Sequence, residues 1–170
     1  MERKNFIPTA ILYRGTILQE MALLEQLLNM YIVKYFCGDD KQKTSDMMLL
    51  IMGDERFTLG NKGQIFKIIA ERDKGWYNSY VSKRQPEGKK NNTLSQDLNF
   101  VIEERNIFAH RLLDGGSINH IIPLPEGTIR FLKMKNKLSP LDYSYQRFNS
   151  IVELIIAIRE HLAIKVIHNE

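Results

Sequence analysis

Apolar residues recur at three- and four-residue spacing along three long segments of this chain, and that period constrains the fold more than any other feature. The first segment spans about Thr9 to Phe36, and the last spans about Tyr143 to Ile167. The middle segment begins at Thr93, which with Gln96 fits a capping box, the pattern that satisfies free N–H groups at a helix start. An all-α helical bundle is therefore expected.

Two shorter helices complete an expected set of about five. Apolar periodicity predicts them at residues 39–52 and 64–72, with a turn or short irregular region at 54–63 between them. Residues 74–92 are polar and rich in Lys, Asn and Gly, so we expect a loop there. Its aromatic residues should either dock part of the loop or continue the third helix.

A small β-hairpin is expected between the last two helices. The helix that begins at Thr93 should stop at Gly115-Gly116, since glycine readily ends a helix. Residues 118–124 and 128–135 are short, β-branched and apolar, and Pro125-Glu126-Gly127 supplies a turn between them. The spacing thus predicts a hairpin insertion at about 118–136.

The composition is that of an ordinary globular domain. The chain has 170 residues, of which 44% are hydrophobic and 26% charged, so we expect a single domain over 1–170. No apolar run approaches the roughly 20 residues that span a bilayer, and the N-terminus lacks a secretory pattern. Cys37 is the only cysteine, which excludes an internal disulfide framework. The expected location is cytoplasmic, away from membranes.

The helix that begins at Thr93 carries a polar interruption in its apolar side. Its two apolar lines are Leu94, Leu98, Val101, Phe108 and Leu112, and beside them Ile102, Ala109 and Leu113. Arg105 occupies the seven-residue gap in the first line, and Asn106 interrupts the second. Because arginine is rarely buried without a partner, we expect Arg105 to have one. With His110 one turn beyond, these residues indicate a site.

Helix geometry limits how these side chains can act together. Arg105 and His110 point about 140° apart and lie about 7.5 Å apart along the axis, so one helix cannot aim both at one phosphate. Asn106 and His110 are four residues apart and share a face. Two copies of the helix across a two-fold axis can merge these groups in one cleft. If the set is a site, we expect it at the interface of a homodimer.

These residue types suit metal-free cleavage of RNA. Histidine exchanges a proton near neutral pH, and arginine stabilises the charge of a phosphorane-like transition state. Asparagine can orient an imidazole or donate to a phosphate oxygen. A structural alternative stays open, in which Arg105 pairs with Glu20 or Glu25 and His110 is a surface residue beside Asp114.

The motif Arg105-Asn106-x-x-x-His110 resembles the R-x(4–6)-H signature of the HEPN superfamily (higher eukaryotes and prokaryotes nucleotide-binding), in which Asn often follows the Arg. The preceding Glu104 and the pair Ala109-His110 look like bacterial members. The first helix is similar to the opening of several such families, through Arg14-Gly15, Leu24-Glu25 and Tyr31-Ile32.

This resemblance implies a helical-bundle dimer and often a metal-independent endoribonuclease that serves as a toxin or in phage defence. Its catalytic positions here are Arg105, Asn106 and His110, with Glu104 as a supporting residue. In one toxin subgroup, paired with a nucleotidyltransferase antitoxin, tyrosine stands two residues after the histidine. This chain has Leu112 there, which argues against that form of antitoxin regulation. Some members lack nuclease activity, so a non-catalytic module for dimerisation, nucleotide binding or protein interaction is the alternative function.

The remaining polar patterns are less specific. Lys133, Lys135 and Lys137 alternate, and in a strand they would share one face that could contact RNA phosphates. The competing explanation is that lysines protect an edge strand from aggregation. His161 and His168 are about 10.5 Å apart along a helix, too far to share an ion. We expect neither a metal nor another cofactor.

Overall fold

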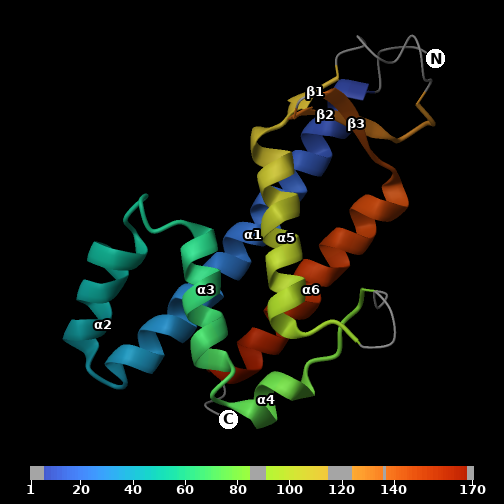
Figure 1. The fold of residues 1–170 in the computed structure, drawn as a ribbon. Coiled ribbons are helices and arrows are strands. Elements are labelled where there is room, and N and C mark those ends of the chain that lie inside the picture. The colour runs from blue at the N-terminus through green and yellow to red at the C-terminus, as the bar shows by residue number, and fades with distance from the viewer. Residues whose placement is uncertain (1–5, 85–90, 115–123, 136, 168–170) are drawn as a thin grey trace.

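The computed structural model describes residues 6–84, 91–114, 124–135 and 137–167. Three long helices, α1 (Phe6–Cys37), α5 (Leu94–His110) and α6 (Tyr145–Ile167), lie side by side in this part of the chain (Figure 1). A fourth helix, α3 (Leu59–Ala70), packs against α1 and α5. The expectation of a mainly helical bundle is confirmed, with six α-helices and a three-stranded antiparallel sheet among the described residues.

The first two predicted helices are present close to their expected limits. After α1 the chain forms α2 (Lys41–Met47), which continues into a π-helical turn, η2 (Met48–Met52). The Asp40 side chain accepts a hydrogen bond from the Lys43 N–H and so begins α2. The apolar positions of this segment were therefore sufficient to predict its helical state.

The prediction of an irregular region up to residue 63 is wrong, because α3 begins at Leu59. Thr58 caps it by accepting from the Asn61 N–H, and Gly63 lies inside the helix. A Cβ atom at Gly63 would stand 3.0 Å from Cδ1 of Ile102. The glycine lets α3 approach α5 closely. In the sequence, a glycine required for helix packing cannot be distinguished from a glycine that marks a turn.

The segment expected to be a loop at 74–92 contains a short helix, α4 (Lys74–Ser79). Docking by its aromatic residues is confirmed, since Trp76 stacks on Tyr31 and on His161 with ring centroids 5.4 and 4.8 Å apart. α4 thereby contacts side chains of both α1 and α6.

The stop expected for α5 at Gly115 is wrong: the helix ends at His110, and β1 (Leu112–Leu113) follows. β1 pairs antiparallel with β2 (Ile129–Lys135), so the strand partner ends the helix five residues before Gly115. The predicted capping box at the other end is confirmed, with Thr93 and Gln96 bonded reciprocally.

A hairpin does lie between the last two helices, but its strands differ from the expected pair. β2 pairs with β3 (Lys137–Tyr143) rather than with residues 118–124. Of that expected strand, 118–123 lie outside the described residues, and Leu124 is not in a strand. Pro140 is tolerated in β3 because β3 is an edge strand.

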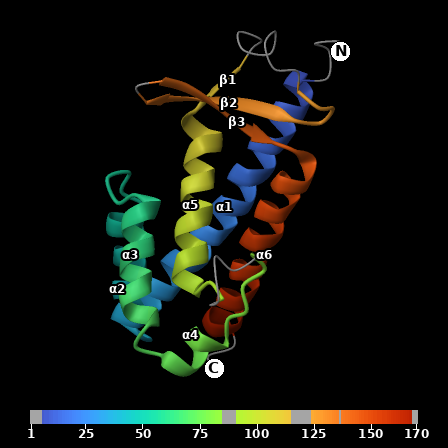
Figure 2. The same cartoon turned by 45° about the vertical axis from the view of Figure 1, so that its right-hand side comes forward.

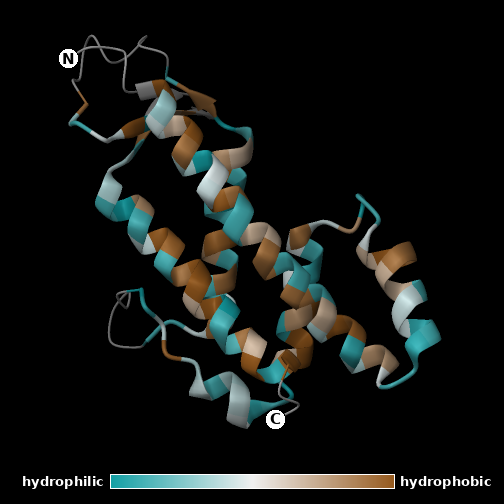
Figure 3. Ribbon diagram, turned by 180° about the vertical axis from the view of Figure 1, so that it is seen from behind, coloured by the Kyte–Doolittle hydropathy of each residue, from teal (hydrophilic) through white to brown (hydrophobic). Residues whose placement is uncertain are grey.

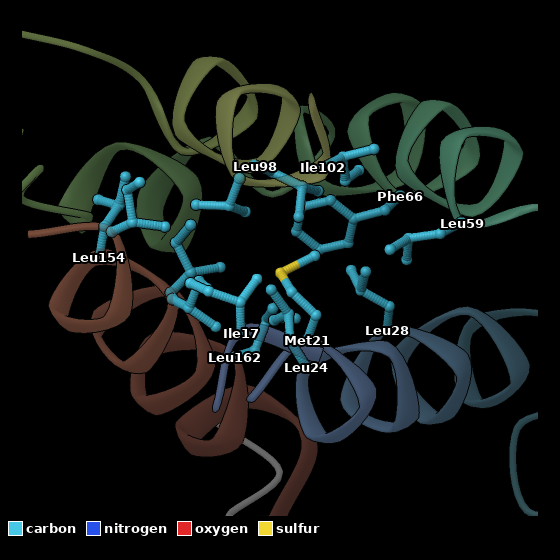
Figure 4. Close-up of a cluster of buried hydrophobic side chains, with 14 of the residues drawn as sticks. Ile17, Met21, Leu24, Leu28, Leu59, Phe66, Leu98, Ile102, Leu154 and Leu162 are labelled. Carbon is cyan, nitrogen blue, oxygen red and sulfur yellow. The ribbon is translucent and has the colours of Figure 1, made fainter. Parts of the chain in front are cut away.

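The core lies between α1, α3, α5 and α6 (Figure 4). Buried side chains from all four helices meet there, including Ile17, Met21, Leu24, Phe66, Leu98 and Leu162. Burying each such side chain contributes about 1.5–3 kcal/mol before entropy is counted. The sheet covers the end of the bundle where α1 begins and α5 ends (Figure 2). Among the described helices, none combines the length and apolar character required to cross a bilayer.

Candidate functional site at the end of helix α5

The three expected catalytic residues lie on the last two turns of α5. Asn106 and His110 are exposed, and Arg105 is half-buried. Nη1 of Arg105 donates a hydrogen bond to Oδ1 of Asn106 over 3.1 Å. The structure thus joins Arg105 to Asn106, and His110 follows one turn later on the side of Asn106. A neutral amide is the partner of this guanidinium, and both can reach a ligand.

The prediction that Arg105 occupies the core line of α5 is wrong, because Glu104 occupies it. Glu104 is only 4% exposed, between the fully buried Val101 and Phe108. Glu104 is three residues after Val101 and Arg105 is four residues after it, and both spacings fit a helical period. The sequence pattern therefore could not decide which of the two side chains points inward.

The buried Glu104 carboxylate is held by two partners, one at the end of β3 and one at the start of α6. The Tyr143 hydroxyl donates to it, and Nη2 of Arg147 lies 3.1 Å from its other oxygen. Burial, and then the bonded carboxylate, raise the pKa of Tyr143. These contacts tie α5 to β3 and α6. They fix the turn of α5 that directly precedes Arg105.

The ion pairs considered for Arg105 in the structural alternative are also wrong. Glu20 bonds Nη1 of Arg159 at 2.5 Å, and Glu25 bonds Nζ of the buried Lys62 at 2.5 Å. Both carboxylates therefore link α1 to other helices, α6 and α3 respectively.

An arginine from α1 caps the end of α5 beside the site. Nη2 of Arg14 donates to the main-chain carbonyl of Arg111 over 2.5 Å, and its guanidinium lies 5.3 Å from the Phe131 ring centre. The C-terminal end of a helix carries partial negative charge, which would repel a phosphate. Arg14 offsets that charge next to His110. No sequence pattern links these positions, which lie 97 residues apart.

The three lysines that were expected to contact RNA phosphates are arranged differently from the prediction. Lys133 and Lys135 lie in β2, whereas Lys137 lies in β3 and pairs in register with Lys135. The prediction that the three alternate along one strand is therefore wrong, because the hairpin turns between the last two. Their side chains lie outside the described set.

A second buried carboxylate holds the segment before α5. Asp97 is fully buried and accepts from the Tyr80 hydroxyl at 2.9 Å and from Ser82 Oγ at 2.5 Å. Arg84, in the same segment, has its Nε 3.2 Å from the Asp97 carboxylate, and its guanidinium lies over the Phe100 ring. Burial, and then the charge on Asp97, raise the pKa of Tyr80. Arg84 is thereby a structural residue.

An open pocket of about 480 Å³, which no sequence pattern indicated, lies near the C-terminal ends of α1, α3 and α6. Its walls are Tyr31, Lys34, Tyr35, Ile69, Arg72, Asp73 and Lys165. Lys165 pairs with Asp73 at 2.8 Å, and burial raises the pKa of Tyr31 to about 12. Three helix C-termini converge there, so their partial negative charge offsets the cations. This balance gives the pocket no clear preference for an anion.

No group of three or more metal-ligating side chains occurs in the described parts of the chain. Comparisons of the chain with protein-family models, with curated proteins and with solved structures found no match.

Proposed function

We propose that this protein is a metal-independent endoribonuclease of the HEPN type, active as a homodimer and serving as a toxin or in phage defence in the cytoplasm. One observation supports it most. The guanidinium of Arg105 is bonded to the neutral amide of Asn106, beside an exposed histidine, at a helix end whose charge Arg14 offsets. Because an amide is neutral, its bond to the guanidinium does not offset the positive charge, which can then bind a phosphate.

The proposed chemistry uses one histidine from each copy. The His110 imidazole of one copy takes the proton of a ribose 2′-hydroxyl, whose oxygen then attacks the adjacent phosphorus. The bond from phosphorus to the 5′-oxygen breaks, and the other copy's imidazolium protonates that oxygen. The products are a 2′,3′-cyclic phosphate and a 5′-hydroxyl. Arg105 stabilises the charge on the phosphoryl oxygens, and Asn106 orients the guanidinium.

The basic hairpin is proposed to guide the RNA. The sheet lies at the end of the bundle where α5 ends (Figure 2), so Lys133, Lys135 and Lys137 belong to the hairpin nearest the site. Each lysine that neutralises a phosphate should add about 0.7 to the slope of log affinity against log salt.

The test is incubation of the purified protein with total RNA in EDTA. His110→Ala should lower the cleavage rate by about 10²–10⁴-fold, because it removes the proton-transfer group. Asn99→Ala is the matched control, since Asn99 is also exposed on α5 but lies about 16 Å from His110 along the helix. Cleavage ends should carry cyclic phosphates. Equal cleavage by wild type and His110→Ala would reject the proposal.

A non-catalytic dimerisation module is the second candidate function. The observation that favours it is a line of exposed apolar residues on α1. Under this function, purified wild-type protein would form dimers and leave RNA intact.

A further inference from the structure

The open pocket where α1, α3 and α6 end lies at the opposite end of the bundle from the sheet. Figure 3 shows hydrophilic and hydrophobic segments next to each other at this end, near the C-terminal label. We call it the helix-end pocket; its wall residues come from α1, α3, the two residues before α4, and α6. Its volume of about 480 Å³ lies within the range of about 300–1,000 Å³ that is typical of small-molecule sites.

One wall residue, Tyr31, brings a nearly buried hydroxyl to the pocket. Tyr31 is only 9% exposed, and its ring is held by Trp76 and Phe66, with ring centroids 5.4 and 5.2 Å away. Its hydroxyl makes no hydrogen bond with the residues that the structure describes. Because the pKa of Tyr31 is raised to about 12, chiefly by burial, the hydroxyl keeps its proton at neutral pH. A nearly buried donor without a partner is costly, so this hydroxyl marks the place where a ligand can accept a hydrogen bond.

Two cations in the wall have only neutral partners within the described ranges. Nη1 of Arg72 donates to the Tyr35 hydroxyl, and the guanidinium lies 5.8 Å from the centre of that ring. Nζ of Lys34 lies 3.5 Å from the main-chain carbonyl oxygen of Val166. Neither side chain forms an ion pair with a described carboxylate, so both can bind the carboxylate of a ligand.

Negative charge lines the same pocket. The Asp73 carboxylate lies 2.8 Å from Nζ of Lys165, and this bond lowers the pKa of Asp73, so the carboxylate is ionised at neutral pH. It also accepts from the Trp76 N–H over 3.3 Å. A carboxylate has about four acceptor sites, so Asp73 can accept a further bond from a ligand ammonium. The partial negative charge of the three helix ends adds to this attraction. The pocket therefore suits a ligand that carries both charges.

We infer that the helix-end pocket binds a small zwitterion, an α-amino acid with an apolar side chain. The ligand carboxylate accepts from the Tyr31 hydroxyl and binds the two cations, while the ligand ammonium donates to Asp73. The apolar side chain packs against Ile69 and the ring of Tyr35, which supply apolar wall surface. A ligand with only a carboxylate would be repelled by Asp73 and the helix ends, and one with only an ammonium would be repelled by the two cations.

Isothermal titration calorimetry at pH 7.5 with four probes tests which charges the ligand needs. L-Leucine and L-phenylalanine carry both charges, N-acetyl-L-leucine carries only the carboxylate, and L-leucine methyl ester carries only the ammonium. The two amino acids should bind with a Kd below about 1 mM. Each blocked leucine should bind at least about 10-fold more weakly than leucine, because it loses a charge-assisted hydrogen bond. Trp76 is the only tryptophan in the chain and stacks on Tyr31, so its fluorescence gives a second measure of binding.

Two variants with matched controls place the ligand in the pocket. Tyr31→Phe keeps the stacked ring and removes the hydroxyl, so it should weaken leucine binding by about 10-fold or more. Tyr145→Phe should leave the affinity unchanged, because Tyr145 is 58% exposed at the start of α6, far from the pocket. Arg72→Met should weaken leucine binding and strengthen binding of the methyl ester, since it removes a cation. Arg56→Met should change neither, because Arg56 pairs with Asp54 outside the pocket. Circular dichroism should show the same helicity in all four variants.

The pocket lies at the opposite end of α5 from Arg105 and His110, so ligand binding and RNA cleavage can be measured separately (Figure 2). Absence of binding by both amino acids at about 10 mM would overturn the proposed site. N-acetyl-L-leucine that binds as tightly as leucine would overturn the assignment of a zwitterion. Equal leucine affinity of Tyr31→Phe and Tyr145→Phe would show that leucine binds elsewhere on the protein, and would overturn the assignment of this pocket.

Discussion

Removing one hydroxyl should reveal how strongly the buried Glu104 depends on its partners. Tyr143 is fully buried, and its hydroxyl donates to the Glu104 carboxylate, which is 4% exposed. Tyr143→Phe keeps the ring and removes only this bond. A hydrogen bond to a charged group contributes about 1.5–3 kcal/mol. In a domain of this size, each kcal/mol shifts Tm by about 2–4 °C, so the expected loss is about 3–12 °C.

The matched control for this variant is Tyr145→Phe, two residues along the chain. Tyr145 is 58% exposed, so losing its hydroxyl should change the free energy of unfolding by less than about 0.5 kcal/mol. Urea unfolding at pH 7.5 measures both variants. Equal stability of Tyr143→Phe and Tyr145→Phe would show that the buried carboxylate does not depend on the hydroxyl. Arg147, whose side chain is 40% exposed, would then be its sufficient partner.

Two further variants test the packing around α3 and α4. His161 stacks on Trp76, and burial lowers the pKa of its imidazole below the usual 6.5. Below about pH 6.5 the unfolded chain therefore binds the proton more readily than the folded chain does. The free energy of unfolding should fall as the pH drops through this range. In His161→Phe, the free energy of unfolding measured at pH 7.5 and at pH 5.5 should no longer show this fall. The same fall in His161→Phe as in wild type would contradict the attribution of the pH dependence to His161. Gly63→Leu should cost about 1–3 kcal/mol, because α3 would be pushed away from α5. Gly60→Leu, at an exposed position on the same helix, should cost little, and equal losses in thermal melts would refute the packing argument.

The two ends of α5 differ in how well the sequence predicts them. Its start follows from Thr93 and Gln96, which bond each other's main-chain N–H groups across three residues. Its end at His110 depends on Leu112 and Leu113 pairing with β2, about twenty residues further on. Local hydrogen bonds are visible in a short sequence window, whereas strand pairing is not, so only the first limit was predictable.

The candidate site shows the same division. The grouping of Arg105, Asn106 and His110 on one helix follows from their spacing, and the structure adds the bond between the first two. Arg14 could not be predicted as their neighbour, because only the approach of α1 to the end of α5 creates that contact.

By itself, the sequence determined the helical character of this protein, the long helices and the turn of α5 on which the polar residues lie. These features follow from a 3.6-residue period and from caps that act within one turn. The tertiary structure alone decided that Glu104 rather than Arg105 is buried, and that β2 pairs with β3. The period permits either residue to face inward. The choice follows from Tyr143 and Arg147, which give the carboxylate its hydrogen bonds and approach it only in the folded chain.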